Sequence, residues 1–240
     1  MTATTTRAII PARLEASRFP RKLLAIWRER TVLEWVWRAT RACDSFSSVT
    51  IATGDEEIGR VAQGFGADVH LDRRPYRNGT ERAAGACQGV HGDVVVVQAD
   101  QPGLQSAHLS CVVNAMKQLD ADMWTPCVPL DERRQSDLDV VKCWTDSATN
   151  NARFARTMPH EARTTRIWRH IGIYAYRQAA IERYAAAGCC EAEKVQRLEQ
   201  LRSLELGQRV RLVPLPTAAP CVDRPEDIDR LNDWFSRSAP

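Results

Sequence analysis

The sequence contains no apolar run that approaches the roughly eighteen residues a membrane-spanning helix needs. Glycine and proline number only 12 each, which excludes a collagen-like chain and leaves no low-complexity segment. Hydrophobic residues make up 44% of the 240 positions and are spread evenly along them. We therefore expect a globular protein that folds as a single domain over residues 1–240 and has no membrane partner.

Paired cysteine motifs are also lacking. None of the 8 cysteines belongs to a C-x-x-C pair, so neither a zinc site nor a disulfide framework is predicted. Residues 1–6 lack the charged and long apolar regions of a signal peptide. These absences favour a reducing, cytoplasmic location.

An excess of charge of one sign is lacking too. The chain carries 33 basic and 30 acidic residues, and a net charge of +3 is too small to indicate a nucleic-acid partner without a basic stripe. Cations do gather locally, because Arg13, Arg18, Arg21 and Lys22 crowd one early segment. Such a cluster suits a small polyanion such as a nucleotide, although a solvated surface explains any one cluster equally well.

Short β-rich runs alternate with helical patterns through the first half of the chain. We predict strands at 7–11, 48–53, 67–71 and 93–98, with helices at 32–43, from 55 and from 79. Four consecutive valines at 94–97 indicate a strand buried on both faces, as at the centre of a parallel sheet. The alternation predicts a three-layer, Rossmann-like α/β fold with a mixed, mostly parallel sheet.

The second half is less regular. There we predict strands at 123–129, 139–144, 171–176 and 210–215, and helices at 191–206 and 224–235. Because ligands of such folds bind at the carboxyl ends of the strands, four segments become candidate sites. These segments are 11–22, 53–55, 77–82 and 98–101.

The loop from Pro11 to Lys22 follows the first predicted strand and holds four cations. Point charges and backbone N–H groups in such a loop can surround a triphosphate. Neither the Walker spacing G-x-x-x-x-G-K-[ST] nor a G-x-G-x-x-G fingerprint is present, which disfavours a P-loop NTPase and a nicotinamide-dinucleotide site.

Two aspartates suit a magnesium ion. Asp100 emerges at the end of the valine strand, and Asp223 follows a transition from apolar residues to a turn. Two carboxylates and the substrate phosphates would satisfy a Mg²⁺ ion that keeps some of its waters. Taken alone, either aspartate is more typical of a helix cap or a turn.

Several longer motifs follow one another in a fixed order: 7–13, 17–20 with Lys22, 78–82, 98–102, 140–142, 169–176, 198–202 and 222–227. In content and order they resemble the motifs of 3-deoxy-manno-octulosonate (Kdo) cytidylyltransferases, the CMP-Kdo synthetases, over nearly the whole chain. The resemblance implies a nucleotide-diphospho-sugar-transferase-like fold and a homodimer. It also implies a smaller region at about 123–177 for acceptor binding and dimerisation.

The activity that the resemblance implies is the Mg²⁺-dependent coupling of CTP to an anionic acceptor with release of pyrophosphate. Implied catalytic residues are Arg13, Lys22 and Asp100, and the magnesium ligands would be Asp100 and Asp223. Implied nucleotide-binding residues are Pro11, Ala12, Arg13, Ser17, Lys22, Asn78, Gly79, Thr80, Arg82 and Gln98. Implied acceptor-binding residues are Gln101, Arg156, His170, Gln196, Glu199 and Gln200. Without the motif, His170 would be explained equally well as a hydrogen-bonded core histidine.

The chain also departs from the family pattern. Arg21 replaces a glycine beside the phosphates, so the loop either adopts another backbone or carries an additional cation. Gly54, Gln101 and Gln196 replace carboxylates. Because amides and arginines suit an anionic ligand better than carboxylates do, these changes favour a small phosphonate over unmodified Kdo. Drift at positions outside the acceptor shell is the alternative.

Three hypotheses follow. The first is a working cytidylyltransferase, acting either on a small phosphonate or a Kdo-like acid, or on Kdo itself as an ordinary CMP-Kdo synthetase. The second is a non-catalytic nucleotide-binding regulatory protein, suggested by Arg21, Gly54 and Gln101. The third, a transferase that uses another nucleotide, is weaker. Joint retention of Arg13, Lys22, Asp100 and Asp223 favours the enzyme.

Overall fold

The computed structural model describes residues 5–157 and 165–238, which form two compact units. The first unit combines the chain up to Ser110 with the C-terminal segment from Ala218, and the second unit is Cys111–Thr217. The expectation of one domain, with an acceptor and dimerisation region at 123–177, stays a prediction.

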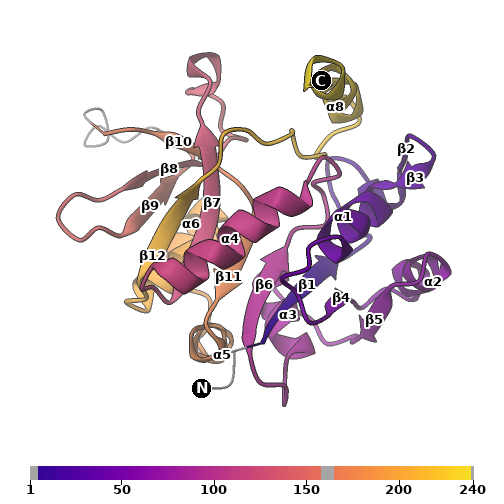
Figure 1. Cartoon of the computed structure of the whole chain (residues 1–240), viewed down its shortest axis with the longest axis horizontal. Helices are drawn as coiled ribbons and strands as arrows, with labels where there is room; N and C mark the ends of the chain where they lie inside the picture. Colours follow the sequence, from indigo (N-terminus) through magenta and orange to yellow (C-terminus); the bar gives the residue numbers. More distant parts are fainter. Residues whose placement is uncertain (1–4, 158–164, 239–240) are drawn as a thin grey trace. The chain divides into compact units, whose positions relative to one another are not determined.

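The first unit is built on four parallel strands in the order β5-β4-β1-β6 (Figure 1). Their bounds are Asp68–Leu71, Val49–Thr53, Thr6–Ala12 and Asp93–Val97, respectively. All five residues of β6 are buried, as the valine run predicts. The register pairs Ile10 with Ile51 on one side of β1 and Ile9 with Val96 on the other, so aliphatic side chains meet across the sheet.

The helices of this unit begin at side chains that cap them. Helix α1 (Val32–Arg41) starts at Thr31, whose hydroxyl accepts the Glu34 N–H, and α3 (Gly79–Ala86) starts at Asn78, whose side chain accepts the Glu81 N–H. Both are S/T/N-x-x-E starts of the kind that sequence alone reveals. Helix α2 (Glu56–Gly64) has no side-chain cap at Asp55, because that carboxylate accepts the Leu14 N–H instead.

The remaining elements of the first unit are short. They are η1 (Lys22–Leu24), the hairpin β2 (Ile26–Trp27) and β3 (Arg30–Thr31), and α8 (Asp227–Ser238). Helix α8 packs on the hairpin, because Trp27 Nε1 donates to Asn232 Oδ1 at 2.8 Å and the rings of Trp27 and Phe235 lie 5.1 Å apart. Helix α4 (Ser106–Gln118) contains the boundary between the units.

The second unit is built around β7 (Met123–Pro129), which pairs antiparallel with β10 (Trp168–His170) and β11 (Ile173–Tyr176). It pairs in parallel with β12 (Val210–Pro214). Strand β8 (Lys142–Thr145) joins β10 to β9 (Ala152–Ala155). The other elements are η2 (Glu132–Arg134), α5 (Gln178–Ala186), α6 (Glu191–Gln196) and α7 (Gln200–Glu205).

The expected α/β class with a mixed sheet is confirmed. The predicted helix 191–206 is wrong as one element, because Arg197 adopts a left-handed conformation (φ 53°) and separates α6 from α7. The predicted strand 139–144 starts three residues late, at Lys142, because the Asp137 carboxylate and carbonyl accept the N–H groups of Asp139 and Val140 in a turn.

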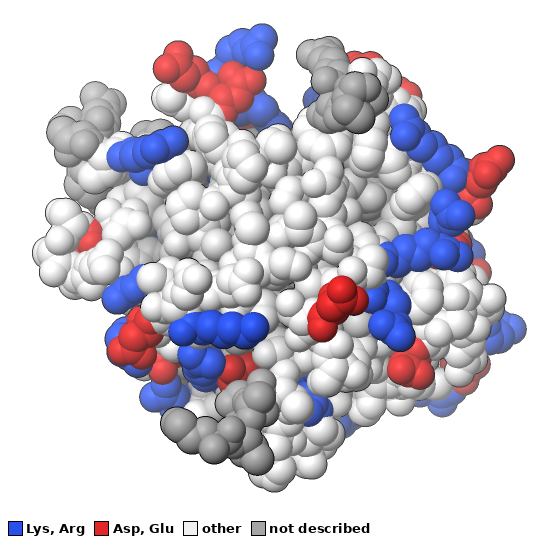
Figure 2. Space-filling model, in the orientation of Figure 1, with Lys and Arg blue, Asp and Glu red and all other residues white. Residues whose placement is uncertain are grey.

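The surface carries charges of both signs. On the face drawn in Figure 2, Lys and Arg side chains lie close to Asp and Glu side chains at several places, which matches the small net charge. No helix within the described ranges is long and apolar enough to cross a membrane.

Candidate active site

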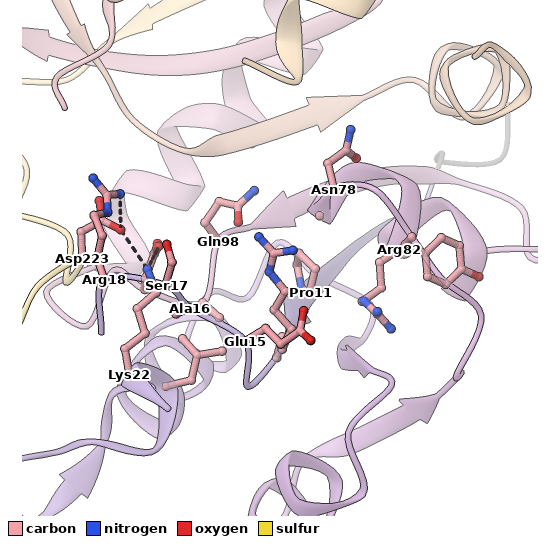
Figure 3. Close-up of a pocket in the computed structure, with 17 residues that line it drawn as sticks. Pro11, Glu15, Ala16, Ser17, Arg18, Lys22, Asn78, Arg82, Gln98 and Asp223 are labelled. Atoms are coloured by element: carbon pink, nitrogen blue, oxygen red, sulfur yellow. Dashed lines mark hydrogen bonds and ion pairs between the residues drawn. The ribbon is translucent and has the colours of Figure 1, made fainter. Parts of the chain in front are cut away.

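A pocket of about 300 Å³ opens in the first unit where β1 and β6 end (Figure 3). Its lining is Pro11, Ala12, Arg13, Glu15, Ala16, Ser17, Arg18, Lys22, Leu23, Tyr76, Asn78, Gly79, Arg82, Gln98, Ala99, Asp100 and Asp223. Three of the four segments selected from the sequence thus meet in one cavity, and segment 53–55 does not line it.

Most predicted nucleotide and metal residues share this pocket. Of the predicted nucleotide-binding set, Thr80 is the exception, since it is fully buried in α3 and does not line the cavity. The lining also includes residues that the sequence analysis did not name as site residues, namely Glu15, Ala16, Arg18, Leu23, Tyr76 and Ala99. For Tyr76, the signal is its position two residues before the Asn78 helix start.

Glycine at position 79 permits a close approach between α3 and two strand ends. A Cβ atom there would lie 3.0 Å from Pro11 Cγ and 3.0 Å from Gln98 Nε2. The close approach lets the start of α3 pack against the ends of β1 and β6. The polar side chains of Asn78 and Gln98 are therefore brought to one wall of the pocket.

Lys22 lies between two carboxylates. Its Nζ atom is 2.7 Å from Asp100 Oδ2 and 3.0 Å from Asp223 Oδ1, and Arg18 Nη2 lies 3.3 Å from the same Asp223 oxygen. Burial of Lys22 opposes its charge, but Asp100 and Asp223 outweigh that effect and raise the pKa of Lys22 above its usual value. Figure 3 shows Lys22, Arg18 and Asp223 together, with Asn78 and Arg82 farther along the pocket.

The backbone around Asp223 is fixed by hydrogen bonds from both sides. The Val222 N–H donates to the Asp100 carbonyl at 2.8 Å, which ties the C-terminal segment to the end of β6. Asp227 Oδ2, at the start of α8, accepts the N–H groups of Asp223 and Arg224 at 2.9 and 2.8 Å. Two carboxylates that are far apart in the sequence, Asp100 and Asp223, are therefore held at one ammonium group.

The two carboxylates fit a magnesium ion that is shared with phosphates. Asp100 and Asp223 already converge on one cation, the Lys22 ammonium, and carboxylate oxygens are the ligands that Mg²⁺ prefers. Across residues 5–157 and 165–238, no group of three or more His, Cys, Asp or Glu side chains is arranged to hold a metal. A magnesium ion here would thus need oxygens from a triphosphate and from water.

Arg21 does not line the pocket. Its backbone is left-handed (φ 59°), the conformation that a glycine adopts easily, and Arg21 Nη1 donates to Glu57 Oε2 at 2.9 Å while Nη2 contacts Oε1. The pair with Glu57 raises the pKa of Arg21 and holds its charge at α2. The glycine-like backbone is thus retained, and the additional cation expected at the phosphates is turned toward α2 instead.

The predicted acceptor residues are not all gathered in one cavity. Gln101 belongs to the first unit and does not line the pocket, whereas the other five belong to the second unit. There, Arg156 and Gln196 line a second cavity of about 560 Å³ that also contains Trp144, Phe154 and Leu201. His170, Glu199 and Gln200 do not line it.

The Arg156 guanidinium donates hydrogen bonds to three backbone carbonyls. Its Nε, Nη1 and Nη2 atoms donate to the carbonyls of Gln196, Leu138 and Arg197 at 2.9, 3.0 and 3.3 Å. These bonds tie the end of β9 to the break between α6 and α7. Binding of an acceptor anion by Arg156 would require some of them to be exchanged.

His170 and Gln200 contact the same tyrosine. The His170 ring stacks on Tyr174 at 5.5 Å and lies edge-on to Phe154, and its Nε2 is 2.8 Å from Thr125 Oγ1. Burial, together with the charge of Arg169, lowers the pKa of His170 to about 3. Gln200 is 1% exposed and accepts from the Tyr174 hydroxyl at 3.4 Å. Glu199, just before α7, accepts the Tyr184 hydroxyl through its backbone carbonyl at 3.2 Å.

Known proteins resemble the chain over nearly its full length. It is 32% identical to the 3-deoxy-manno-octulosonate cytidylyltransferase of Solibacter usitatus, with 96% of this chain and 94% of that protein covered. It is 33% identical to the enzyme of the same description from Synechococcus elongatus, with 96% and 98% covered. These relatives confirm the resemblance that the motifs predict.

Solved structures show the same fold. A CMP:2-keto-3-deoxy-manno-octonic acid synthetase complexed with CTP matches with a TM-score of 0.88 at 23% identity, covering 98% of this chain and 99% of that one. A 4-diphosphocytidyl-2C-methyl-D-erythritol synthase from Anaerococcus prevotii matches with a TM-score of 0.67 at 14% identity, covering 98% and 99%. The family model for cytidylyltransferases matches residues 7–210. The chain therefore belongs to the cytidylyltransferase family, is a nucleotidyltransferase, and falls among the 3-deoxy-manno-octulosonate cytidylyltransferases.

Proposed function

We propose that this protein is a Mg²⁺-dependent enzyme that transfers CMP from CTP to an anionic acceptor, a Kdo-like acid or a small phosphonate, and releases pyrophosphate. The observation that carries the proposal is the convergence of Lys22, Asp100 and Asp223 in one pocket with Arg13. Fixed charges of both signs at this place suit a triphosphate and its metal ion.

In this reaction an oxygen of the acceptor forms a bond to the α-phosphorus of CTP, and the bond from that phosphorus to the pyrophosphate oxygen breaks. Arg13 and Lys22 would stabilise the charge that develops on the phosphate oxygens. Asp100 and Asp223 would hold Mg²⁺, which would supply further stabilisation of the same charge. Asn78, Gly79, Arg82 and Gln98 line the remainder of the pocket, where we place the base and the ribose.

Lys22 would pair with carboxylates when the nucleotide is absent and with phosphate oxygens when it is bound. In the structure its ammonium pairs with both Asp100 and Asp223, and Arg18 pairs with Asp223 as well. A triphosphate in the pocket offers oxygens to the same ammonium, and the carboxylates then become available to a divalent cation.

Different observations favour the two acceptor classes. A Kdo-like acid is supported by the relatives, which are described as 3-deoxy-manno-octulosonate cytidylyltransferases. A phosphonate is supported by the amides Gln101 and Gln196 in place of carboxylates. Arg21 no longer supports the phosphonate, because Glu57 binds its guanidinium away from the pocket.

We further propose a cytoplasmic homodimer that contacts no nucleic acid. The dimer rests on the resemblance, and the absence of a nucleic-acid partner rests on the nearly balanced charge. Light scattering at several protein concentrations tests the dimer, and a monomer at all of them would exclude it.

The test of the function is a pyrophosphate-release screen with CTP, Mg²⁺ and one acceptor at a time. The acceptors are Kdo, its amino analogue, sialic-type acids and small phosphonates. Release with one of these classes, lost in the Asp100→Asn variant, supports the enzyme and identifies the acceptor. CTP binding without release from any acceptor would favour the non-catalytic regulatory protein instead.

A further inference from the structure

Arg82 lines the nucleotide pocket and has no carboxylate partner within the described part of the chain. Its Nη1 atom donates to the Asp72 backbone carbonyl at 3.1 Å, and its guanidinium lies over the Tyr76 ring, 5.0 Å from the centroid. A Cβ atom on Gly54 would lie only 3.4 Å from Arg82 Nη1 and 3.1 Å from the Asp72 carbonyl. Glycine at position 54 therefore leaves space for Arg82 while providing no negative charge.

Tyr76 is held on two sides. Its hydroxyl donates to Asp72 Oδ2 at 2.6 Å, and a Cβ atom on Gly85 of α3 would lie 2.0 Å from the Tyr76 Oη atom. Glycine at position 85 thus makes the space in which the phenol lies. Burial raises the pKa of Tyr76, and the bond to Asp72 raises it further, so the hydroxyl keeps its proton and donates it.

The other side of this cluster involves Arg74. The Asp72 carboxylate also accepts the Arg74 N–H at 2.9 Å and its Nε at 2.8 Å. The Arg74 guanidinium lies 5.6 Å from the Tyr76 centroid, but Arg74 does not line the pocket. Two arginine guanidinium groups therefore contact the Tyr76 ring, and of these only Arg82 lines the nucleotide pocket.

We propose that Tyr76 is a positioning residue for nucleotide binding: its ring holds the Arg82 guanidinium in the pocket, and Gly85 is required to admit that ring. The inference rests on the proposed function, because it assumes that the pocket binds CTP. A guanidinium that is already ordered loses less side-chain entropy when the nucleotide binds. A cation over an aromatic face also needs no carboxylate that would compete with the ligand for its donors.

The experiment measures CTP affinity by isothermal titration calorimetry with Mg²⁺ present, together with KM and kcat. Tyr76→Leu should weaken CTP binding about three- to tenfold and raise KM with little change in kcat. Tyr76→Phe keeps the ring and should stay within about twofold of wild type. Arg74→Gln, which removes the arginine outside the pocket, is the matched control and should also stay within about twofold.

A double-mutant cycle shows whether Tyr76 acts through Arg82. In the Arg82→Ala background, Tyr76→Leu should cause no further loss of CTP affinity. An equal loss in both backgrounds, or unchanged affinity in Tyr76→Leu alone, would overturn the inference. Gly85→Ala should weaken CTP binding as much as Tyr76→Leu does. If circular dichroism shows that Gly85→Ala does not fold, the double-mutant cycle alone tests the inference. If the wild type binds CTP and Tyr76→Leu binds it with the same affinity, only the role of Tyr76 is refuted. If the wild type binds no CTP, the proposed function is refuted as well.

Discussion

The carboxylate of Asp227 accepts a hydrogen bond from the backbone N–H of Asp223 at 2.9 Å. Asp227 is 6% exposed and lies at the start of α8, so the helix and the turn that carries Asp223 are fixed by one buried side chain. Asp227→Ala should lower the free energy of unfolding by about 1–3 kcal/mol, because two backbone N–H groups lose a charged acceptor, and should lower turnover as well. Chemical denaturation and steady-state kinetics measure the two effects. Arg230→Ala, which removes only the exposed partner of Asp227, should change neither appreciably.

Replacing either proposed magnesium ligand tests the metal site. Asp100→Asn or Asp223→Asn should reduce kcat by orders of magnitude and leave the circular dichroism spectrum unchanged, because both side chains lie at the rim of a pocket and not in the core. Asp229→Asn, on the exposed side of α8, is the matched control. Full activity in Asp223→Asn would remove that residue from the site.

The two neighbouring cations of the early loop should differ sharply. Lys22→Ala should raise the activation free energy by about 2–4 kcal/mol, because it removes an electrostatic contact to the phosphates. Arg21→Gly should leave kcat and the KM for CTP within about twofold of wild type, because it relieves a left-handed arginine and breaks only an exposed ion pair. A tenfold loss in Arg21→Gly would show that Arg21 acts on the nucleotide after all.

His170 should make stability depend on pH. Its pKa is about 3 in the folded protein, below its ordinary value of 6.5, so the unfolded chain binds a proton more readily than the folded one between these values. Stability contributed in this way is present above about pH 6.5 and is lost as pH falls toward 3. His170→Asn should therefore flatten the pH dependence of the unfolding free energy in this window. An unchanged slope in His170→Asn would contradict the burial of a neutral imidazole.

The acceptor preference tests the replaced carboxylates. If Gln101 and Gln196 contact the acceptor, a small phosphonate should exceed Kdo in kcat/KM with CTP, and Gln101→Glu with Gln196→Glu should move the preference back toward Kdo. Either single variant should give an intermediate preference. A wild type that prefers Kdo by tenfold or more would make the protein an ordinary CMP-Kdo synthetase.

Much of the fold follows from local patterns. The valine run predicts β6, and the predicted helices at 32–43 and from 79 begin where Thr31 and Asn78 cap α1 and α3 in the structure. The sequence does not predict the split of the helix 191–206. The helix is interrupted at the left-handed Arg197, where the carbonyls of Gln196 and Arg197 accept hydrogen bonds from Arg156, about forty positions away.

The residues of the site also differ in how well the sequence predicts them. Strand ends indicate Pro11, Asn78, Gln98 and Asp100, since parallel strands deliver their carboxyl ends to one edge. No spacing in the sequence reveals that the Arg21 guanidinium binds Glu57. Nor does any spacing reveal that Gly85 leaves the space in which Tyr76 lies. The predicted acceptor residues are the least predictable set, because apart from Gln101 they come from helices, a strand and loops of the second unit.

The most direct measurement follows product formation from CTP and Mg²⁺ with the best acceptor from the screen. Wild-type protein should form pyrophosphate and a CMP-acceptor conjugate in equal amounts, detected by mass spectrometry, and Asp100→Asn should form neither at a comparable rate. Absence of the conjugate with every anionic acceptor, in a wild-type protein that binds CTP by calorimetry, would contradict a transferase built on Lys22, Asp100 and Asp223.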